Sequence, residues 1–245
     1  MDFSIYLAFT GAESAAMTAY PEKKAWFGCR FSSHSSGLAI HEPPQNKCDA
    51  LILTDETPPN GHDPDQVSHA LAKAALRMEC QAIILDFQRA PTQESQALVK
   101  TILKSAPCAV IISAAHSSET DNPILLNPPP LWTPLAEAIA PWKGRDIWLE
   151  IGPESGTVSL KEEGSTYSPC DTAGYFPFRD DALHLSYRID RLEGSLRFLL
   201  QRTANDLPAF LAEAKALGVT GVIGLYQELG TSLIQQIPTC NRLDL

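Results

Sequence analysis

Short apolar runs alternate with amphipathic stretches along most of the chain, and this alternation predicts a parallel α/β fold. Several of the runs are apolar almost throughout, as expected for strands that are covered on both faces. We predict eight strands, at residues 3–9, 25–31, 50–54, 82–87, 108–113, 146–151, 183–188 and 220–226.

The segments between these strands carry helical patterns of uneven quality. Apolar residues recur at helical spacing in 65–79 and 92–105, which predicts two amphipathic helices. A shorter helix is expected at 133–140, and two more are expected at 193–204 and 207–217. Because eight βα units fit into this length only if some helices are short or missing, we predict a reduced, irregular (β/α)8 TIM-like barrel.

Two regions depart from the alternation. Residues 10–48 contain no long helical pattern, and SSHSSG at 32–37 is typical of a turn between two strand-like pieces. Residues 152–182 contain TVSL and STYS around an acidic turn, which predicts a β-hairpin. We expect both regions to be irregular insertions in a single barrel domain spanning 1–245, since neither is long enough for a core of its own.

Charge narrows the range of partners. The 245 residues include 19 Lys and Arg against 29 Asp and Glu, so the net charge is −10 at pH 7. That balance argues against nucleic acid and anionic membranes, because both require a clustered basic surface. No apolar stretch approaches the ~18 residues of a membrane span. Asp2 stands where a signal peptide carries Lys or Arg, so we expect a cytoplasmic protein.

The six cysteines stand alone in the sequence, at 29, 48, 80, 108, 170 and 240. No C-x-x-C pair and no zinc-ligand spacing occurs, and a disulfide framework is not expected at this length. We therefore expect buried thiols, and we assign no metal, no cofactor and no redox role.

The fourth predicted strand carries the most specific motif. It reads QAIILDFQ and ends at Gln88. This segment resembles the fourth strand of family 18 glycoside hydrolases, the chitinase-like barrels, whose signature is D-G-x-D-x-D-[WF]-E. The match holds at Asp86 and Phe87, whereas Gln81 and Ile84 stand where the first two acids would be. Gln88 stands where the family has its catalytic Glu.

Two further segments fit the same family template. The last strand looks like the family's eighth strand, with Tyr226 near its usual Trp. The run 146–151, taken as the sixth strand, ends in Leu149 and Glu150 where the family often has a Tyr-Asp pair. The resemblance implies a site at the carboxyl ends of the strands, where barrels of this kind place their chemistry.

The change at Gln88 affects the chemistry that the resemblance implies. Family 18 enzymes protonate the leaving oxygen with a Glu at this position, and a primary amide cannot donate that proton. We expect no hydrolysis by the family mechanism, although an amide can still hydrogen-bond a sugar. The catalytic candidates are Asp86, Gln88 and Glu150. The ligand-binding candidates, all placed at predicted strand ends, are Asp55, Glu56, Tyr187, Arg188, Tyr226 and Glu228.

Three functions stay open. The first is a non-catalytic or strongly diverged glycosidase-like barrel that binds a carbohydrate. The second is an active glycoside hydrolase that uses Asp86 with Glu150 or Glu228, which requires a carboxylate pair ~5–5.5 Å or ~6.5–9.5 Å apart across an open cleft. The third is a protein-interaction scaffold without a small ligand. The sequence leaves the oligomeric state open.

Overall fold

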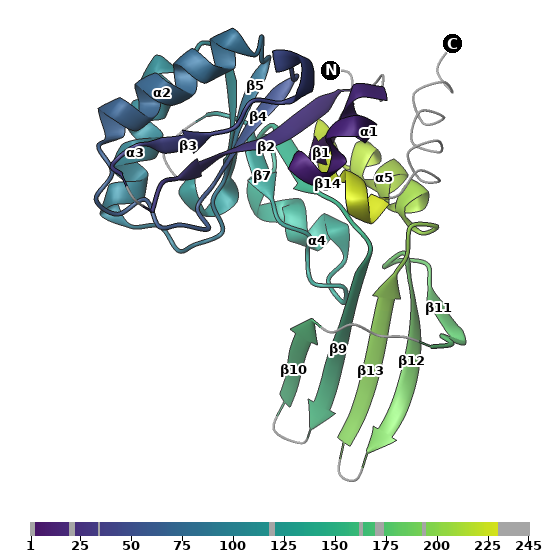
Figure 1. The fold of residues 1–245 in the computed structure, drawn as a ribbon. Helices are drawn as coiled ribbons and strands as arrows, with labels where there is room; N and C mark the ends of the chain where they lie inside the picture. Colours follow the sequence, from purple (N-terminus) through teal and green to yellow (C-terminus); the bar gives the residue numbers. More distant parts are fainter. Residues whose placement is uncertain are drawn as a thin grey trace. The chain divides into compact units, whose positions relative to one another are not determined.

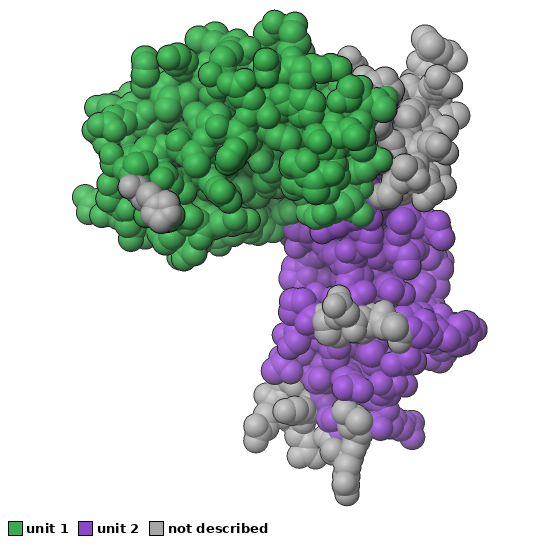
Figure 2. All heavy atoms as spheres, in the orientation of Figure 1, with its two compact units in different colours: residues 1–127, 144–150, 220–227 green, residues 128–143, 151–219, 228–245 purple. Residues whose placement is uncertain are grey.

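The structure is a computed structural model, drawn in Figure 1. It describes residues 3–19, 23–33, 35–117, 121–161, 164–169, 174–192 and 195–229. The chain divides into two compact units, which Figure 2 shows in different colours. Unit 1 comprises residues 1–127, 144–150 and 220–227, and unit 2 comprises residues 128–143, 151–219 and 228–245.

Parallel strands of unit 1 close into an eight-stranded barrel. In chain order they are β1 (Ser4–Phe9), β2 (Lys24–Phe31), β4 (Ala50–Thr54), β5 (Ala82–Asp86), β6 (Ala109–Ser113), β7 (Ile124–Leu126), β8 (Ile147–Glu150) and β14 (Gly221–Leu225). The ring closes because β1 pairs with both β14 and β2 (Figure 1). The short strand β3 (Leu38–Ile40) joins β2 in the antiparallel direction. The prediction of an irregular TIM-like barrel is confirmed.

Inward-pointing side chains fill the barrel. Ile52 of β4 and Ile84 of β5 belong to one buried cluster that also contains Tyr6 and Trp148. The rings of Tyr6 and Trp148 lie 5.3 Å apart. Gly221 makes room for this packing, because a Cβ there would stand 2.7 Å from the Trp148 ring. The barrel interior is therefore a packed core, so a ligand would bind at one end of it.

The helical elements of unit 1 include α1 (Ser14–Ala19), α2 (Pro64–Arg77) and α3 (Gln93–Ser105), with 3-10 turns η1 (Gly11–Glu13), η2 (Pro44–Asn46) and η3 (Ala114–His116). The two longest helices, α2 and α3, begin at capping side chains. The Asp63 carboxylate accepts the backbone N–H of Asp65 at 2.9 Å, and the Thr92 hydroxyl accepts that of Ser95 at 3.1 Å. Both amphipathic helices predicted from the sequence are confirmed as α2 and α3.

Unit 2 contains a five-stranded antiparallel sheet in the order β10–β9–β13–β12–β11. The strands are β9 (Glu154–Lys161), β10 (Gly164–Pro169), β11 (Phe178–Asp180), β12 (Leu185–Leu192) and β13 (Ser195–Arg202). The helical elements are α4 (Leu135–Ile139), η4 (Ala140–Trp142) and α5 (Leu207–Ala216). The hairpin predicted within 152–182 is confirmed as β9 and β10, and α4 and α5 confirm the helices predicted at 133–140 and 207–217.

Two predictions that fall in this sheet are wrong. Residues 183–188 contribute to β12 rather than to a barrel strand, and residues 193–204 contain strand β13 rather than a helix. Leu196, Phe198 and Leu200 recur every second residue, and each pairs directly with a residue of β9. Pairing on both sides, with β9 and β12, decides the conformation of a segment whose leucines also fit a helical spacing.

The barrel strand that the sequence does not reveal is β7. It has only three residues, Ile124–Leu126, followed by Asn127 and three prolines. The strand that ends in Glu150 is consequently the seventh of the barrel, and its comparison with the family's sixth strand is wrong. The run that ends in Asp86 is the fourth barrel strand, as predicted.

The sequence predicts a single domain over 1–245. The division into two compact units describes packing and does not test this prediction. The region 10–48 contains α1, β2, β3 and η2, and most of the region 152–182 that the structure describes belongs to the sheet of unit 2. Within the described ranges, no helix is long and apolar enough to cross a membrane.

Candidate functional site

The carboxyl end of the barrel carries a chain of polar side chains centred on Gln88. Gln88 follows β5, and its amide nitrogen donates to the Asp86 carboxylate at 2.5 Å. Its amide oxygen accepts a hydrogen bond from the Asn127 side chain at 2.6 Å, directly after β7. Both ends of the Gln88 amide are thus engaged, which fixes the orientation of the group.

Asp86 is the innermost member of this chain. It is half-buried at the end of β5, and burial raises its pKa, while the hydrogen bond from Gln88 lowers it and the charges of Asp55 and Glu56 raise it. The net shift is upward, so this carboxyl group takes up a proton more readily than an exposed Asp.

A small hollow lies at the centre of the barrel mouth. Asp86 and Glu150 both line it, together with apolar side chains such as Ile84 and Ile223. Its volume is about 20 Å³. That is room for a single water molecule and far too little for a sugar ring. The structure therefore places Asp86 and Glu150 in the lining of one small hollow, and Gln88, the third catalytic candidate, contacts Asp86.

A larger hollow of about 720 Å³ lies beside the first and shares Phe27 and Leu225 with it. Its walls come from β2, β4 and β14 and from the segments that follow β1, β3, β4 and β14. The side chains that give it chemical character are Trp26, Phe27, Arg30, His41, Glu56 and Gln227. Volumes of ~300–1,000 Å³ are usual for small-molecule sites.

Trp26 and Gly28 shape one wall of this larger hollow. The indole N–H of Trp26 donates to the backbone oxygen of His41 at 2.8 Å. A Cβ on Gly28 would stand 2.2 Å from the indole ring and 2.6 Å from the same His41 oxygen. Only glycine permits this close approach, so the wall depends on the residue at position 28.

Trp26, Arg30 and His41 are not among the site residues predicted from the sequence. They lie in or beside β2 and β3, within the region 10–48 that carries little regular pattern. Their only signal in the sequence is that Arg30 and Trp26 belong to a predicted barrel strand. Of the predicted ligand-binding residues, Glu56 lines the larger hollow.

Asp55 lies below the surface, where it anchors a loop. It is 3% exposed, and its carboxylate accepts the backbone N–H groups of Gln88 at 2.8 Å and Arg89 at 3.0 Å. The Ser113 hydroxyl at the end of β6 anchors the same loop, because it accepts a hydrogen bond from the Phe87 N–H at 2.8 Å. These two residues hold the segment that positions Gln88.

Of the remaining predicted ligand residues, Tyr226 lies at a strand end of the barrel, whereas Tyr187, Arg188 and Glu228 belong to unit 2. Tyr187 and Arg188 lie within β12 of unit 2, so the expectation that they end a barrel strand is wrong. Tyr187 stacks on Phe178 with ring centroids 5.3 Å apart. Glu228 also belongs to unit 2, where burial raises its pKa. Tyr226 follows β14 in unit 1 and stacks on Phe9 at 4.9 Å.

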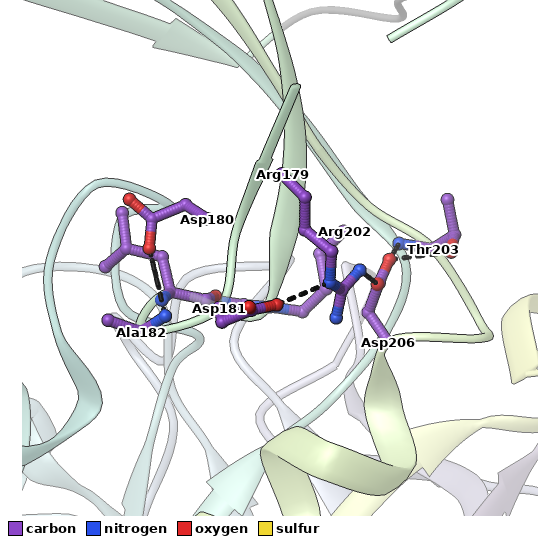
Figure 3. A network of polar contacts seen from close by, with 8 residues as sticks. Arg179, Asp180, Asp181, Ala182, Arg202, Thr203 and Asp206 are labelled. Carbon is purple, nitrogen blue, oxygen red and sulfur yellow. Dashed lines mark hydrogen bonds and ion pairs between the residues drawn. The ribbon is translucent and has the colours of Figure 1, made fainter. Parts of the chain in front are cut away.

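Arg179 organises a second polar cluster, which Figure 3 shows from close by. Its residues belong to unit 2. The Arg179 guanidinium contacts Asp181 at 2.7 Å and Asp206 at 2.6 Å. The Asp206 carboxylate also accepts from the backbone N–H and the hydroxyl of Thr203, each at 2.7 Å. The cluster ties β11 to the start of α5, which is a structural role.

Arg202 and Glu154 form a buried ion pair beside this cluster. Arg202 is 3% exposed, donates to Glu154 at 3.2 Å and to the Leu183 carbonyl at 3.2 Å, and lies over the Phe210 ring. Burial raises the pKa of Glu154 to about 7, against the opposing effect of Arg202. Glu154 of β9 and Arg202 of β13 are direct partners in the register of the sheet, so the ion pair links the two strands.

No cluster of metal ligands occurs in the part of the chain that the structure describes, since no three His, Cys, Asp or Glu side chains converge there. His116, which follows β6 in η3, is buried against Ser95, whose hydroxyl lies 3.2 Å from its Nε2. Burial lowers the pKa of His116, so the ring is neutral near pH 7.

Comparison with known proteins adds fold-level evidence. No protein-family model matches the sequence, and no curated protein matches it. Among solved structures, the chitinase-like agglutinin RobpsCRA of Robinia pseudoacacia aligns with a TM-score of 0.58 and 11% identity over 89% of this chain and 93% of that one.

Two enzymes align comparably. The class V chitinase of Nicotiana tobaccum has a TM-score of 0.56 and 8% identity, over 91% of this chain and 93% of its own. The spore cortex-lytic enzyme SleL of Bacillus cereus has a TM-score of 0.57 and 11% identity, over 91% of this chain and 70% of its own. The chain therefore has the barrel fold of the family 18 chitinases and chitinase-like proteins, as the fourth-strand resemblance predicts.

Proposed function

We propose that the protein binds a glycan at the carboxyl end of its barrel and does not hydrolyse it by the family 18 mechanism. The observation that carries this proposal is the side chain at position 88. The amide of Gln88 stands where the resemblance expects a carboxylic acid, and it is held between Asp86 and Asn127.

The chemistry of an amide supports this proposal. Cleavage of a glycosidic bond needs a group that protonates the leaving oxygen, and loss of general acid catalysis typically costs ~10²–10⁴-fold in rate. Gln88 has no proton to give at neutral pH. Beyond its bonds to Asp86 and Asn127, the amide has a second N–H donor and a second oxygen lone pair, and such oriented groups hydrogen-bond sugar hydroxyls in binding sites.

The larger hollow supports the binding half of the proposal. It combines aromatic side chains, Trp26 and Phe27, with polar side chains such as Arg30 and Glu56. Sugars present both an apolar ring face and hydroxyl groups, so they suit a lining of this mixed character. Among the similar structures, one is a chitinase in complex with NAG4 and another is a chitinase-like agglutinin.

A second candidate is an active hydrolase that uses Asp86 and Glu150. The observation in its favour is that both carboxyl groups line the same small hollow and that the pKa of Asp86 is raised, as a proton donor requires. The volume of that hollow, about 20 Å³, argues against a sugar ring bound between them.

Calorimetric titration with tetra-N-acetylchitotetraose tests the proposal. We expect saturable binding to the wild type, at least about tenfold weaker binding to Arg30→Ala, and unchanged binding to Arg191→Ala. The control removes an equally exposed arginine from β12 of unit 2. Equal affinity of wild type and Arg30→Ala would remove the larger hollow as the site, and shortened products in the recovered sugar would favour the hydrolase.

A further inference from the structure

Cys48 and Cys80 stand side by side at the amino end of the barrel, the end away from the mouth. Cys48 lies two residues before β4, and Cys80 lies two residues before β5. These strands pair in parallel with Ala50 opposite Ala82, so positions 48 and 80 continue the same register. Residues in register on neighbouring strands direct their side chains to the same face.

The contacts around the two cysteines show that this register extends beyond the strands. The Lys47 ammonium contacts the Glu79 carboxylate at 2.6 Å, one position before the cysteines. The Gln81 N–H donates to the Asp49 carbonyl at 2.8 Å, one position after them. The two segments that carry the cysteines are therefore joined on both sides.

The two thiols are in contact. Their sulfur atoms lie 3.4 Å apart and share a hydrogen bond. Neighbouring strands are ~4.8 Å apart, which falls within the Cα separation that a disulfide spans. Little backbone movement would therefore be needed to join these two sulfur atoms.

The pair is also reachable from solvent. Cys80 is partly exposed, whereas Cys48 is 6% exposed. A hollow of about 320 Å³ opens beside them and is lined by Cys48, Lys47, Glu79 and Met78. The hollow gives a small oxidant a route to Cys48, and Cys80 is accessible through its own partial exposure.

The shared hydrogen bond makes the two thiols unequal. The hydrogen bond from Cys48 lowers the pKa of Cys80, because it stabilises the Cys80 thiolate. The same contact and burial raise the pKa of Cys48. Thiolates rather than thiols attack oxidants, so Cys80 is the more reactive of the two.

We propose that Cys48 and Cys80 form an oxidisable pair that closes to a disulfide on exposure to a peroxide. The Cys80 thiolate attacks one peroxide oxygen, the O–O bond breaks, and a sulfenic acid forms while the leaving hydroxide takes up a proton to become water. The Cys48 sulfur then attacks the sulfenic sulfur, the S–O bond breaks, and a second water leaves with the Cys48 proton. Two thiols lose two electrons and two protons, and one peroxide is reduced to two waters.

Two other thiols serve as internal comparisons. Cys29 is buried, and burial raises its pKa to about 12. Cys108 is partly exposed, and burial raises its pKa to about 11. Both are free thiols in the structure. A selective reaction at Cys48 and Cys80 would thus reflect the contact between them.

Peptide mapping of the intact chain tests the proposal. The folded protein is treated with hydrogen peroxide, its free thiols are alkylated, and it is digested with trypsin without reductant. We expect the peptides 48–73 and 78–89 to appear as one species that has lost two hydrogens and separates on reduction. Recovery of both peptides in alkylated form would overturn the proposal, as would a link from Cys80 to Cys108 instead.

Two variants sharpen this experiment. Cys108→Ser leaves the expected cross-link unchanged, and it is the matched control for the loss of a partly exposed thiol. In Cys48→Ser, the reaction stops at the Cys80 sulfenic acid, which dimedone traps. A cross-link that disappears in Cys108→Ser, or a Cys80 that dimedone does not label in Cys48→Ser, would contradict the proposed chemistry. The wild-type map remains decisive if Cys48→Ser fails to fold.

Discussion

Replacing Gln88 by Glu creates a pair of carboxyl groups at hydrogen-bond distance. In the wild type, the Gln88 amide nitrogen donates to Asp86 at 2.5 Å. A Glu side chain of the same length puts an oxygen in that place, so the two groups share one proton or repel each other. The other oxygen of Glu still accepts the hydrogen bond from Asn127, which leaves the rest of the chain of contacts intact.

The size of the effect follows from Coulomb's law. Two unit charges about 4 Å apart repel by about 1 kcal/mol in water and by about 4 kcal/mol at an effective dielectric constant of 20. Position 88 is exposed and Asp86 is half-buried, so we expect a value of about 1–2 kcal/mol. The carboxyl pKa is then raised in the folded state. The Gln88→Glu variant therefore keeps its full free energy of unfolding below about pH 4, the carboxyl pKa of the unfolded chain. It loses free energy of unfolding as the pH rises through the raised pKa of the folded state.

Thermal unfolding at pH 4 and pH 8 measures this effect. We expect Gln88→Glu to match the wild type at pH 4 and to unfold about 2–8 °C lower at pH 8. Gln96→Glu, an exposed position of α3, is the matched control and should show no such pH dependence. An equal Tm deficit at both pH values would mean that the two carboxyl groups do not interact, contrary to this prediction.

Three further changes have defined outcomes. Gly28→Ala should lower the free energy of unfolding, measured with denaturant, by about 1–3 kcal/mol, because the new Cβ meets the Trp26 ring and a backbone oxygen. Gly11→Ala is the control, because a Cβ there has free space. Equal losses in the two variants would contradict the close approach at Gly28. Asp55→Asn should lower the free energy of unfolding by about 1–3 kcal/mol, because an amide group cannot accept both backbone N–H groups. An unchanged unfolding midpoint would show that Asp55 does not anchor the loop. Burial raises the pKa of Glu154 to about 7, so it stabilises the fold fully below about pH 4 and progressively less as the pH rises through 7. Glu154→Gln should flatten the dependence of Tm on pH between 5 and 8, and a slope identical to that of the wild type would contradict the raised pKa.

Local patterns revealed most of the barrel. β5 is a continuous apolar run that ends in an acid, so both the strand and Asp86 are visible in the sequence. β7 is not visible, because three apolar residues before a run of prolines carry no strand signal of their own. It takes its place in the barrel through pairing with β6 and β8, which is a long-range effect.

The candidate site likewise contains residues that the sequence pattern predicts and residues that only the fold brings together. Asp86, Gln88 and Glu150 follow apolar strands, and their positions at the barrel mouth follow from that pattern. His41 lies at the larger hollow because β3 folds back on β2 and because the His41 carbonyl accepts a hydrogen bond from the Trp26 indole N–H. The cysteine pair also escapes the sequence, since 48 and 80 become neighbours only through the register of β4 and β5.

The central claim is that the barrel mouth holds a glycan without cleaving it. The most direct measurement is a titration of the wild-type protein with tetra-N-acetylchitotetraose, followed by mass spectrometry of the recovered sugar. The claim predicts a saturable binding isotherm and recovery of the intact tetrasaccharide. Recovery of shorter oligosaccharides, or no binding to this sugar or to any member of a glycan array, would contradict it.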